Sequence, residues 1–325
     1  MRKERYFGSV RFFKNMILLF VIVAITVPSI LAIHFHNQLN ALDVSAISDA
    51  EKDREDAEQT AEKDGKDEEN HENKGQAQKP TTHTPGLYSE DAPAYQSLYP
   101  DFYAPEHGTD FVREEDMIYL TFDDGPSSVT DSILDTLKAK GVKATFFVIG
   151  KTDEADFQRM RRIVSEGHTL AMHSYSHNYA AIYASVEDYL ADMYEIFCQI
   201  RDVTGVTPTL FRFPGGSINS YNVATSEALI TEMLRRGFIP FDWNISSQDA
   251  ASSQGASASE ICGNVVDRAA NVYRGVVLMH DTAAKRTTAE ALPQMIDKLR
   301  AMGFSFSALT PEVQPVIYGY RNDLH

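Results

Sequence analysis

The sequence predicts an α/β fold, a distorted barrel of seven parallel strands, preceded by one transmembrane helix and a disordered linker. Three observations predict this organisation. Short apolar runs alternate with helical patterns from about residue 112 onward, which is typical of a parallel sheet built from βαβ units. An uncharged apolar run lies near the N-terminus, and a strongly acidic stretch separates it from the alternating region.

The N-terminus combines positive charge with hydrophobicity. Residues 1–15 carry five basic side chains and one acidic side chain, whereas residues 16–33 carry no charge. A helix of the second segment would be roughly 27 Å long, close to the thickness of the hydrocarbon core of a bilayer. We expect 1–15 to be a short cytoplasmic tail and 16–33 a transmembrane signal-anchor, because the basic end of a span stays inside. The alternative is a cleaved signal peptide, although Ile30 stands where such a site favours a small residue; either way the remainder is exported.

Residues 34–110 are predicted to be an acidic disordered linker and an extended lead-in. Within them, residues 40–75 hold thirteen acidic and five basic side chains, which account for half of the chain's net charge of −16. Such a segment buries too little apolar surface to offset the entropy lost on ordering. Because the acidity belongs to this linker, we expect no nucleic-acid partner, and no motif indicates an obligate protein partner.

The folded domain is predicted to span residues 111–310, with residues 311–325 as a C-terminal tail. Its strands are expected at seven apolar runs, which are 118–122, 144–149, 169–172, 209–212, 239–243, 276–279 and 304–308. Seven strands give one βα unit fewer than the common eightfold barrel.

Helical patterns fill the intervals between these runs. Leu134 and Leu137 share one face of a helix that Gly141 ends. Ser185 resembles the N-cap of a helix that ends at Gly205. Four further glycines are expected to end helices: Gly167, Gly237, Gly275 and Gly303.

Cys198 and Cys262 both lie in helical stretches. Outside the cell a disulfide between them could persist, but the sequence does not place their Cα atoms within bonding range. Two small core residues are favoured over a disulfide.

Polar side chains follow the predicted strands at the ends where the chain leaves them. In parallel α/β folds these ends share one rim, where catalytic groups gather. Five groups follow five of the runs: Asp123 and Asp124, His173 and His177, Arg212, Asp249, and His280. Chance would scatter such residues between both ends of the strands. His168 precedes a strand and receives no role.

Asp123 and Asp124 are adjacent carboxylates that repel each other unless one of them is neutralised. His173 and His177 are four residues apart, so both imidazoles can face one ion to which a carboxylate adds a third ligand. A divalent cation there would neutralise one aspartate, acidify bound water and leave the other aspartate as a base. Each motif alone is a weak signal, but together they predict a metal-dependent hydrolase.

Five short motifs resemble those of a known family. The segments "TFDDGP", "HSYSH", "RFPGGS", "WNISSQDA" and "LMH" have the order and spacing of the motifs of NodB-type polysaccharide deacetylases, carbohydrate esterase family 4. The resemblance covers residues 115–310 and implies a distorted (β/α)7 barrel of the NodB type. It implies nothing about the N-terminal segment or the linker.

The resemblance also implies how the base and the metal are held. Asp123 matches the general base, and Arg212 matches the arginine that orients and ionises it. Asp124, His173 and His177 match the metal ligands. The ion of this family is usually zinc, and Co²⁺, Ni²⁺ or Mn²⁺ also serve.

Four further residues match the other side of the site. His280 matches the general acid, and Asp249 matches the carboxylate that keeps its imidazole charged. The backbone N–H of Gly215 matches an oxyanion donor, and Leu278 matches the apolar residue beside the acetyl methyl group. The fourth motif of the family often has tryptophan after its aspartate, but Ala250 follows here, so we expect a differently walled acetyl pocket.

We therefore expect hydrolysis of N-acetyl groups from hexosamine residues of an extracellular glycan, with peptidoglycan as the substrate and the enzyme tethered to the cell membrane. One alternative is an esterase that removes O-acetyl groups from xylan or another polysaccharide. Another is a catalytically dead glycan-binding scaffold. A non-haem iron oxygenase also uses two histidines and a carboxylate, but it leaves the base and the acid without a use.

Overall fold

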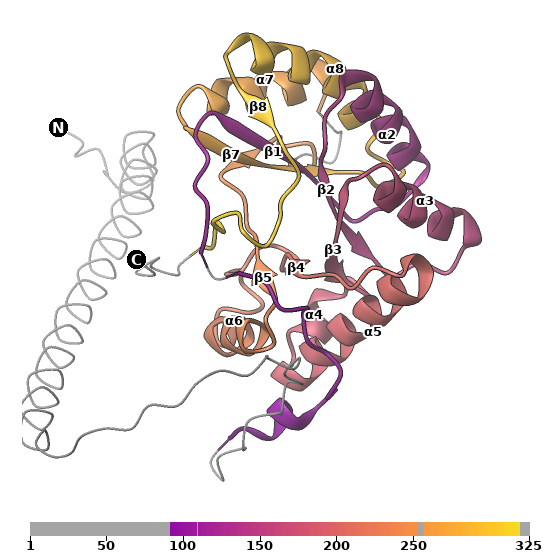
Figure 1. Cartoon of the computed structure of the whole chain (residues 1–325), viewed down its shortest axis with the longest axis vertical. Coiled ribbons are helices and arrows are strands. Elements are labelled where there is room, and N and C mark those ends of the chain that lie inside the picture. The colour runs from indigo at the N-terminus through magenta and orange to yellow at the C-terminus, as the bar shows by residue number, and fades with distance from the viewer. Residues whose placement is uncertain (1–91, 109, 252–255, 319–325) are drawn as a thin grey trace, which may run out of the picture. The chain divides into compact units, whose positions relative to one another are not determined.

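The computed structural model describes residues 92–108, 110–251 and 256–318, which Figure 1 shows in colour. The predicted cytoplasmic tail, the predicted signal-anchor and most of the acidic linker lie outside these residues. Among the helices in the described ranges, none combines the length and the hydrophobicity that crossing a bilayer requires.

Eight parallel strands of the described residues form one sheet. In chain order they are β1 Met117–Asp123, β2 Thr145–Ile149, β3 Thr169–Ser174, β4 Leu210–Phe211, β5 Ile239–Pro240, β6 Ile245–Ser246, β7 Arg274–His280 and β8 Ser305–Phe306. Their spatial order is β5-β4-β3-β2-β1-β7-β6, and β8 pairs with the start of β1. All pairs are parallel, so the carboxyl ends of the strands lie on one side of the sheet. The predicted α/β class is confirmed.

The chain itself joins the two ends of this strand order. β5 and β6 are the outermost strands, and a four-residue link, 241–244, connects them. The prediction of one strand over 239–243 was wrong, because the amide of Asp242 leaves the ladder and donates to the carbonyl of Val316 at 2.6 Å. The chain then reaches β7 as a second short strand. The result is a distorted barrel whose last gap is crossed by the link.

Side chains of the strands alternate between two cores. On β1, Ile118, Leu120 and Phe122 pack between the sheet and the helices, whereas Tyr119 packs inside the barrel. The same period of two places Asp123 on the inner face at the end of the strand. Apolar residues of the other strands and of the link 241–244 fill the interior below it: Phe147, Ala171, Leu210, Ile239, Phe241 and Val276.

Helices surround the sheet (Figure 1). They are η1 Ala94–Ser97, α2 Ser128–Lys140, α3 Glu154–Ser165, α4 Tyr179–Ile182, α5 Val186–Thr204, α6 Ser226–Arg235, α7 Ala258–Ala269 and α8 Arg286–Ala301. The predicted ends at Gly141 and Gly205 are confirmed, with positive φ angles of 62° and 74° that glycine adopts without strain. The predicted cap is also confirmed, because Ser185 Oγ accepts the amide of Asp188 at 3.0 Å.

Gly275 does not end a helix, so that expectation was wrong. It lies inside β7, where a Cβ would come within 2.7 Å of side-chain atoms of Ile118 and Ile245. Close approach of three strands therefore explains the glycine. Cys198 in α5 and Cys262 in α7 are both free thiols, as favoured, but only Cys262 is a buried core residue, whereas Cys198 is partly buried.

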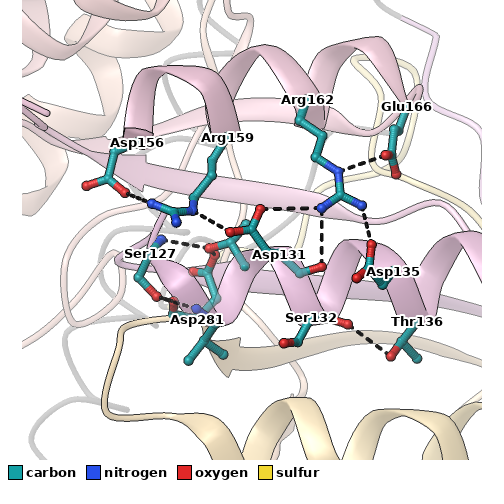
Figure 2. Close-up of polar contacts among 12 residues, drawn as sticks. Ser127, Asp131, Ser132, Asp135, Thr136, Asp156, Arg159, Arg162, Glu166 and Asp281 are labelled. Carbon is teal, nitrogen blue, oxygen red and sulfur yellow. Dashed lines mark hydrogen bonds and ion pairs between the residues drawn. The ribbon is translucent and has the colours of Figure 1, made fainter. Parts of the chain in front are cut away.

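An ion-pair network links α2 to α3 (Figure 2). Arg159 Nε donates to Asp131 Oδ2 at 2.8 Å. Arg162 contacts Asp131 at 3.3 Å and Glu166 at 2.8 Å. Single exposed pairs contribute little to stability, whereas a network of shared carboxylates contributes more. The network fixes the two helices on either side of β2.

The described part of the lead-in is attached to the domain. Phe102 is fully buried in the main core. The buried guanidinium of Arg236 donates to the carbonyl oxygens of Leu98 and Tyr99 at 2.9 and 3.2 Å. Glu232 lies 2.6 Å from the same guanidinium and balances its charge.

Candidate active site

The alternation of side chains explains where the predicted site residues lie. Each inner face carries an apolar residue in the interior and, two residues further on, a site residue at the rim. His173 follows Ala171 on β3, and Arg212, directly after β4, follows Leu210. On β7, Leu278 and His280 follow Val276. The register of β1 and β7 pairs Asp123 with His280. The strands thus bring the predicted base, the predicted acid and one metal ligand to one rim.

The two adjacent carboxylates at the end of β1 have different partners. Asp123 is only 2% exposed and accepts a hydrogen bond from Arg212 Nη1 at 2.8 Å. Asp124 has a φ angle of 71°, in the left-handed region, and its carboxylate lies beside His173 and His177. Arg212 therefore neutralises Asp123, whereas Asp124 lies beside two imidazoles and would be neutralised by a bound cation.

Asp124, His173 and His177 form the candidate metal site. Asp124 Oδ1 lies 3.4 Å from His173 Nε2 and 3.1 Å from His177 Nε2, and the three ligand atoms lie within 4.8 Å of one another. Asp124 Oδ1 is buried and has no hydrogen-bond partner among the described residues. A buried, unsatisfied carboxylate oxygen beside two imidazole nitrogens fits a divalent cation, which would complete its contacts.

A backbone carbonyl orients the imidazole of His173, and a serine hydroxyl holds the backbone of His177. His173 Nδ1 lies 2.8 Å from the carbonyl oxygen of Arg212, which can only accept. Nδ1 therefore carries the proton, and Nε2 presents its lone pair to the site. His177 has a left-handed φ angle of 52°, and its amide donates to Ser174 Oγ at 2.8 Å.

Asp192 on α5 holds the loop between the two histidines. It accepts hydrogen bonds from Ser174 Oγ at 2.5 Å and from the amides of Tyr175 and Ser176 at 2.8 Å each. Sequence reasoning missed Asp192, because one acid on an amphipathic helix looks like any solvated acid. The serines of "HSYSH" were the available signal that a polar partner is needed.

Asp192→Asn is expected to weaken divalent-metal binding by about 10–100-fold, because one amide oxygen cannot serve three donors as a carboxylate does. Calorimetric titration of the full-length chain with Zn²⁺ measures the effect. Asp202→Asn, at an exposed position of the same helix, is the matched control and should bind Zn²⁺ like the unchanged chain. Equal affinities of all three proteins would show that the loop does not depend on Asp192.

Arg212 is fully buried in the barrel interior. Besides Asp123, it donates to Thr121 Oγ1 at 2.7 Å and to the carbonyl oxygens of Phe241 and Asp242 at 2.7 and 3.2 Å. It therefore ties the link 241–244 to β1 and places a permanent positive charge against the predicted base.

His280 and Asp249 form a hydrogen-bonded pair. His280 Nδ1 lies 2.8 Å from Asp249 Oδ1, and Asp249 Oδ2 accepts the amide of His280 and the hydroxyl of Thr288 at 2.8 and 2.9 Å. Burial alone would favour the neutral imidazole, but the hydrogen bond and charge of Asp249 raise the pKa of His280 to about 9. The imidazole is therefore protonated at neutral pH. Sequence reasoning missed Thr288, which comes from α8.

The loop after β4 and the inner face of β7 border these groups. Gly215 is exposed, with a φ angle of 78°, and its N–H donates no hydrogen bond within the described part of the chain. Leu278 is half-buried, two residues before His280.

Trp243, the chain's only tryptophan, also reaches this loop. A Cβ on Gly216 would lie 3.4 Å from Trp243 Cη2. The indole of Trp243 therefore borders the loop, whereas Ala250, at the position where the family often has tryptophan, is exposed. The sequence did not predict that Trp243 lies beside this loop, because Trp243 precedes Asp249 by six residues instead of following it directly.

Comparisons with known proteins agree with the geometry. A family profile described as polysaccharide deacetylase matches residues 112–233. A putative polysaccharide deacetylase of Bacillus subtilis, YheN, is 35% identical over 201 residues, which are 61% of this chain and 69% of that protein. A peptidoglycan-N-acetylglucosamine deacetylase of Bacillus cereus is 35% identical over 214 residues, 65% of this chain and 76% of that protein.

A solved structure is also similar. The catalytic domain of a peptidoglycan N-acetylglucosamine deacetylase from Eubacterium rectale superposes with a TM-score of 0.62 and 34% identity, and the match covers 66% of this chain and 98% of that one.

Proposed function

Because the chain belongs to the polysaccharide deacetylase family, we propose that it hydrolyses N-acetyl groups of hexosamine residues in peptidoglycan, outside the cell and with a bound divalent metal. The observation that carries this proposal is the pairing of Asp123 with His280 on adjacent strands, beside three convergent metal-ligating side chains. Base, acid and metal site are separate groups, so one residue can take the proton of water while another protonates the departing amine.

Asp124, His173 and His177 would hold the ion. A divalent cation such as Zn²⁺ polarises a carbonyl group and activates water when bound, and Co²⁺, Ni²⁺ or Mn²⁺ can do the same. The lone pair of His173 Nε2 faces the site because Nδ1 is bonded to the Arg212 carbonyl.

Asp123 is the proposed proton acceptor. Arg212 occupies its Oδ1, so Oδ2, which lies 4.0 Å from His173 Nε2, remains on the metal side. A water molecule attacking the acetyl carbonyl would pass its proton to that oxygen. The exposed N–H of Gly215 would donate to the carbonyl oxygen as negative charge develops there.

His280 is the proposed proton donor. Its Nδ1–H donates a hydrogen bond to Asp249, so the proton on Nε2 is the one free to move to the departing nitrogen. An amine leaves poorly as an anion, and a histidine with a pKa of about 9 carries this proton at neutral pH. Leu278, two residues earlier on the inner face, would contact the acetyl methyl group.

The choice of peptidoglycan rests on the names of relatives, several of which are peptidoglycan-N-acetylglucosamine deacetylases. The location rests on the sequence of residues 16–33, proposed to anchor the chain in the cell membrane, and on the acidic linker that would let the domain reach a cell-wall polymer. These features make the proposed enzyme a tethered one.

Acetate release from a panel of glycans tests the function. The full-length chain is expected to release acetate from N-acetylated peptidoglycan fragments, to lose this activity with a chelator and to regain it with Zn²⁺, because the metal activates the carbonyl. Release from acetylated xylan alone would establish the O-acetyl esterase instead. Glycan binding without any acetate release from a metal-loaded protein would establish the scaffold.

A further inference from the structure

An apolar surface lies on the loop between β4 and α6. Eight large hydrophobic side chains are exposed in the described residues, and three of them lie in this loop, within six consecutive positions: Ile218, Tyr221 and Val223. We call these three residues the loop platform. Apolar side chains that gather on one exposed segment mark binding surfaces, whereas single ones are ordinary.

Two asparagines hold the loop that carries the platform. Asn219 Nδ2 donates to the carbonyl of Pro214 at 3.0 Å, and Asn219 Oδ1 accepts the amide of Tyr221 at 2.8 Å. Asn222 is fully buried, and its Oδ1 accepts the amide of Asn219 at 2.7 Å. Asn222 thus faces inward, whereas the three apolar side chains of the platform are exposed to solvent. A surface fixed in this way loses little entropy when it binds.

Aromatic rings connect the platform to the candidate metal site. The centroids of His177 and Tyr179 are 5.3 Å apart, and those of Tyr179 and Tyr221 are also 5.3 Å apart. Tyr179 also packs closely against the candidate oxyanion loop, since a Cβ on Gly215 would lie 2.8 Å from its Cε1. The rings of Tyr179 and Tyr221 thus lie in series between His177 and the loop platform.

We propose that the loop platform binds the sugar ring next to the one that is deacetylated, and that it makes the enzyme prefer glycan chains to single sugars. This inference rests on the proposed function. A pyranose ring presents C–H groups on its face and hydroxyl groups at its edge. The ring of Tyr221 offers a flat apolar surface with a hydroxyl at its rim, which matches that pattern. Ile218 and Val223, which precede and follow Tyr221 in the sequence, are also exposed and add apolar surface to the loop.

The test compares a chain substrate with a sugar-free one in the full-length protein. Tyr221→Ala is expected to raise KM for a tetramer of N-acetylglucosamine about tenfold, with kcat nearly unchanged, because the stacking surface is lost. Tyr221→Phe should have a KM much closer to that of the wild type than Tyr221→Ala, because it keeps the ring and loses only the hydroxyl at its rim. Hydrolysis of a small activated acetyl ester should be the same in all three proteins. Tyr273→Ala is the matched control, since Tyr273 is 72% exposed and precedes β7 at the opposite end of the barrel.

An unchanged KM for the tetramer in Tyr221→Ala would overturn the inference. An equal loss on the ester would overturn it as well, because Tyr221 would then act on the reacting centre. If the wild type released no acetate from the tetramer or from N-acetylated peptidoglycan fragments, the proposed function would fall on its own. Calorimetric titration of wild type and Tyr221→Ala with the tetramer would still test whether the loop platform binds a sugar ring. Equal affinities would overturn the inference.

Discussion

Asp123→Asn is expected to lower the rate of acetate release by roughly a hundredfold to ten-thousandfold while the metal stays bound. The amide cannot accept a proton from water, but it has the size of the carboxylate and can still accept from Arg212 Nη1, which lies 2.8 Å from Oδ1. Steady-state kinetics on N-acetylated glycan fragments and elemental analysis of the purified full-length variant measure the two effects.

His177→Ala is the contrasting variant. It is expected to lose both metal and activity, because His177 Nε2 lies 3.1 Å from Asp124 Oδ1 within the candidate metal site. Equal metal loss in Asp123→Asn and His177→Ala would contradict the separation of base from ligand.

His280→Ala is expected to slow hydrolysis of the N-acetyl amide by roughly a hundredfold to ten-thousandfold and to slow hydrolysis of an activated aryl ester much less. An amine must be protonated to leave, whereas a phenolate leaves without a proton. Rates on the two substrates under the same conditions measure the difference. Equal losses on both would mean that His280 does not act as the acid.

The pH profile gives an independent check of the same assignment. The acid form of His280 is present below a pKa of about 9 and is lost as the pH rises through that value. Amide hydrolysis by the wild type should therefore decline above about pH 9. Asp249→Asn removes the charge that stabilises the imidazolium, so its decline should begin at lower pH. If the pH profiles of wild type and Asp249→Asn were the same, Asp249 would not be the residue that keeps His280 protonated.

Much of the site could be predicted because its residues end recognisable strands. The apolar runs before Asp123, His173 and His280 are long enough to identify as strands, and the two-residue period then sets which side chains face inward. The chemistry of the side chains then indicated a metal, since two imidazoles and a carboxylate lie at one rim. The roles of Gly215 and Leu278 came from the family resemblance.

Other parts depended on contacts that no local pattern reveals. The segment 239–243 looks like one apolar strand, but the carbonyl of Val316, more than seventy residues later in the sequence, takes the amide of Asp242 and interrupts it. Asp192 and Thr288 contribute because α5 and α8 lie over particular loops. Helix placement is a tertiary property, so the sequence alone did not single out these residues.

The short outer strands have a consequence for self-association. β5 and β6, at the two ends of the strand order, contain two residues each, and the link 241–244 runs from one to the other. An unpaired strand edge is where a second copy of a chain adds its own strand, and long flat edges are the usual origin of fibrillar aggregates. In the described part of the sheet, another molecule would find only two-residue templates, at β5, at β6 and at β8, which pairs with the start of β1. Crowded copies of this domain should therefore remain separate instead of growing into shared sheets.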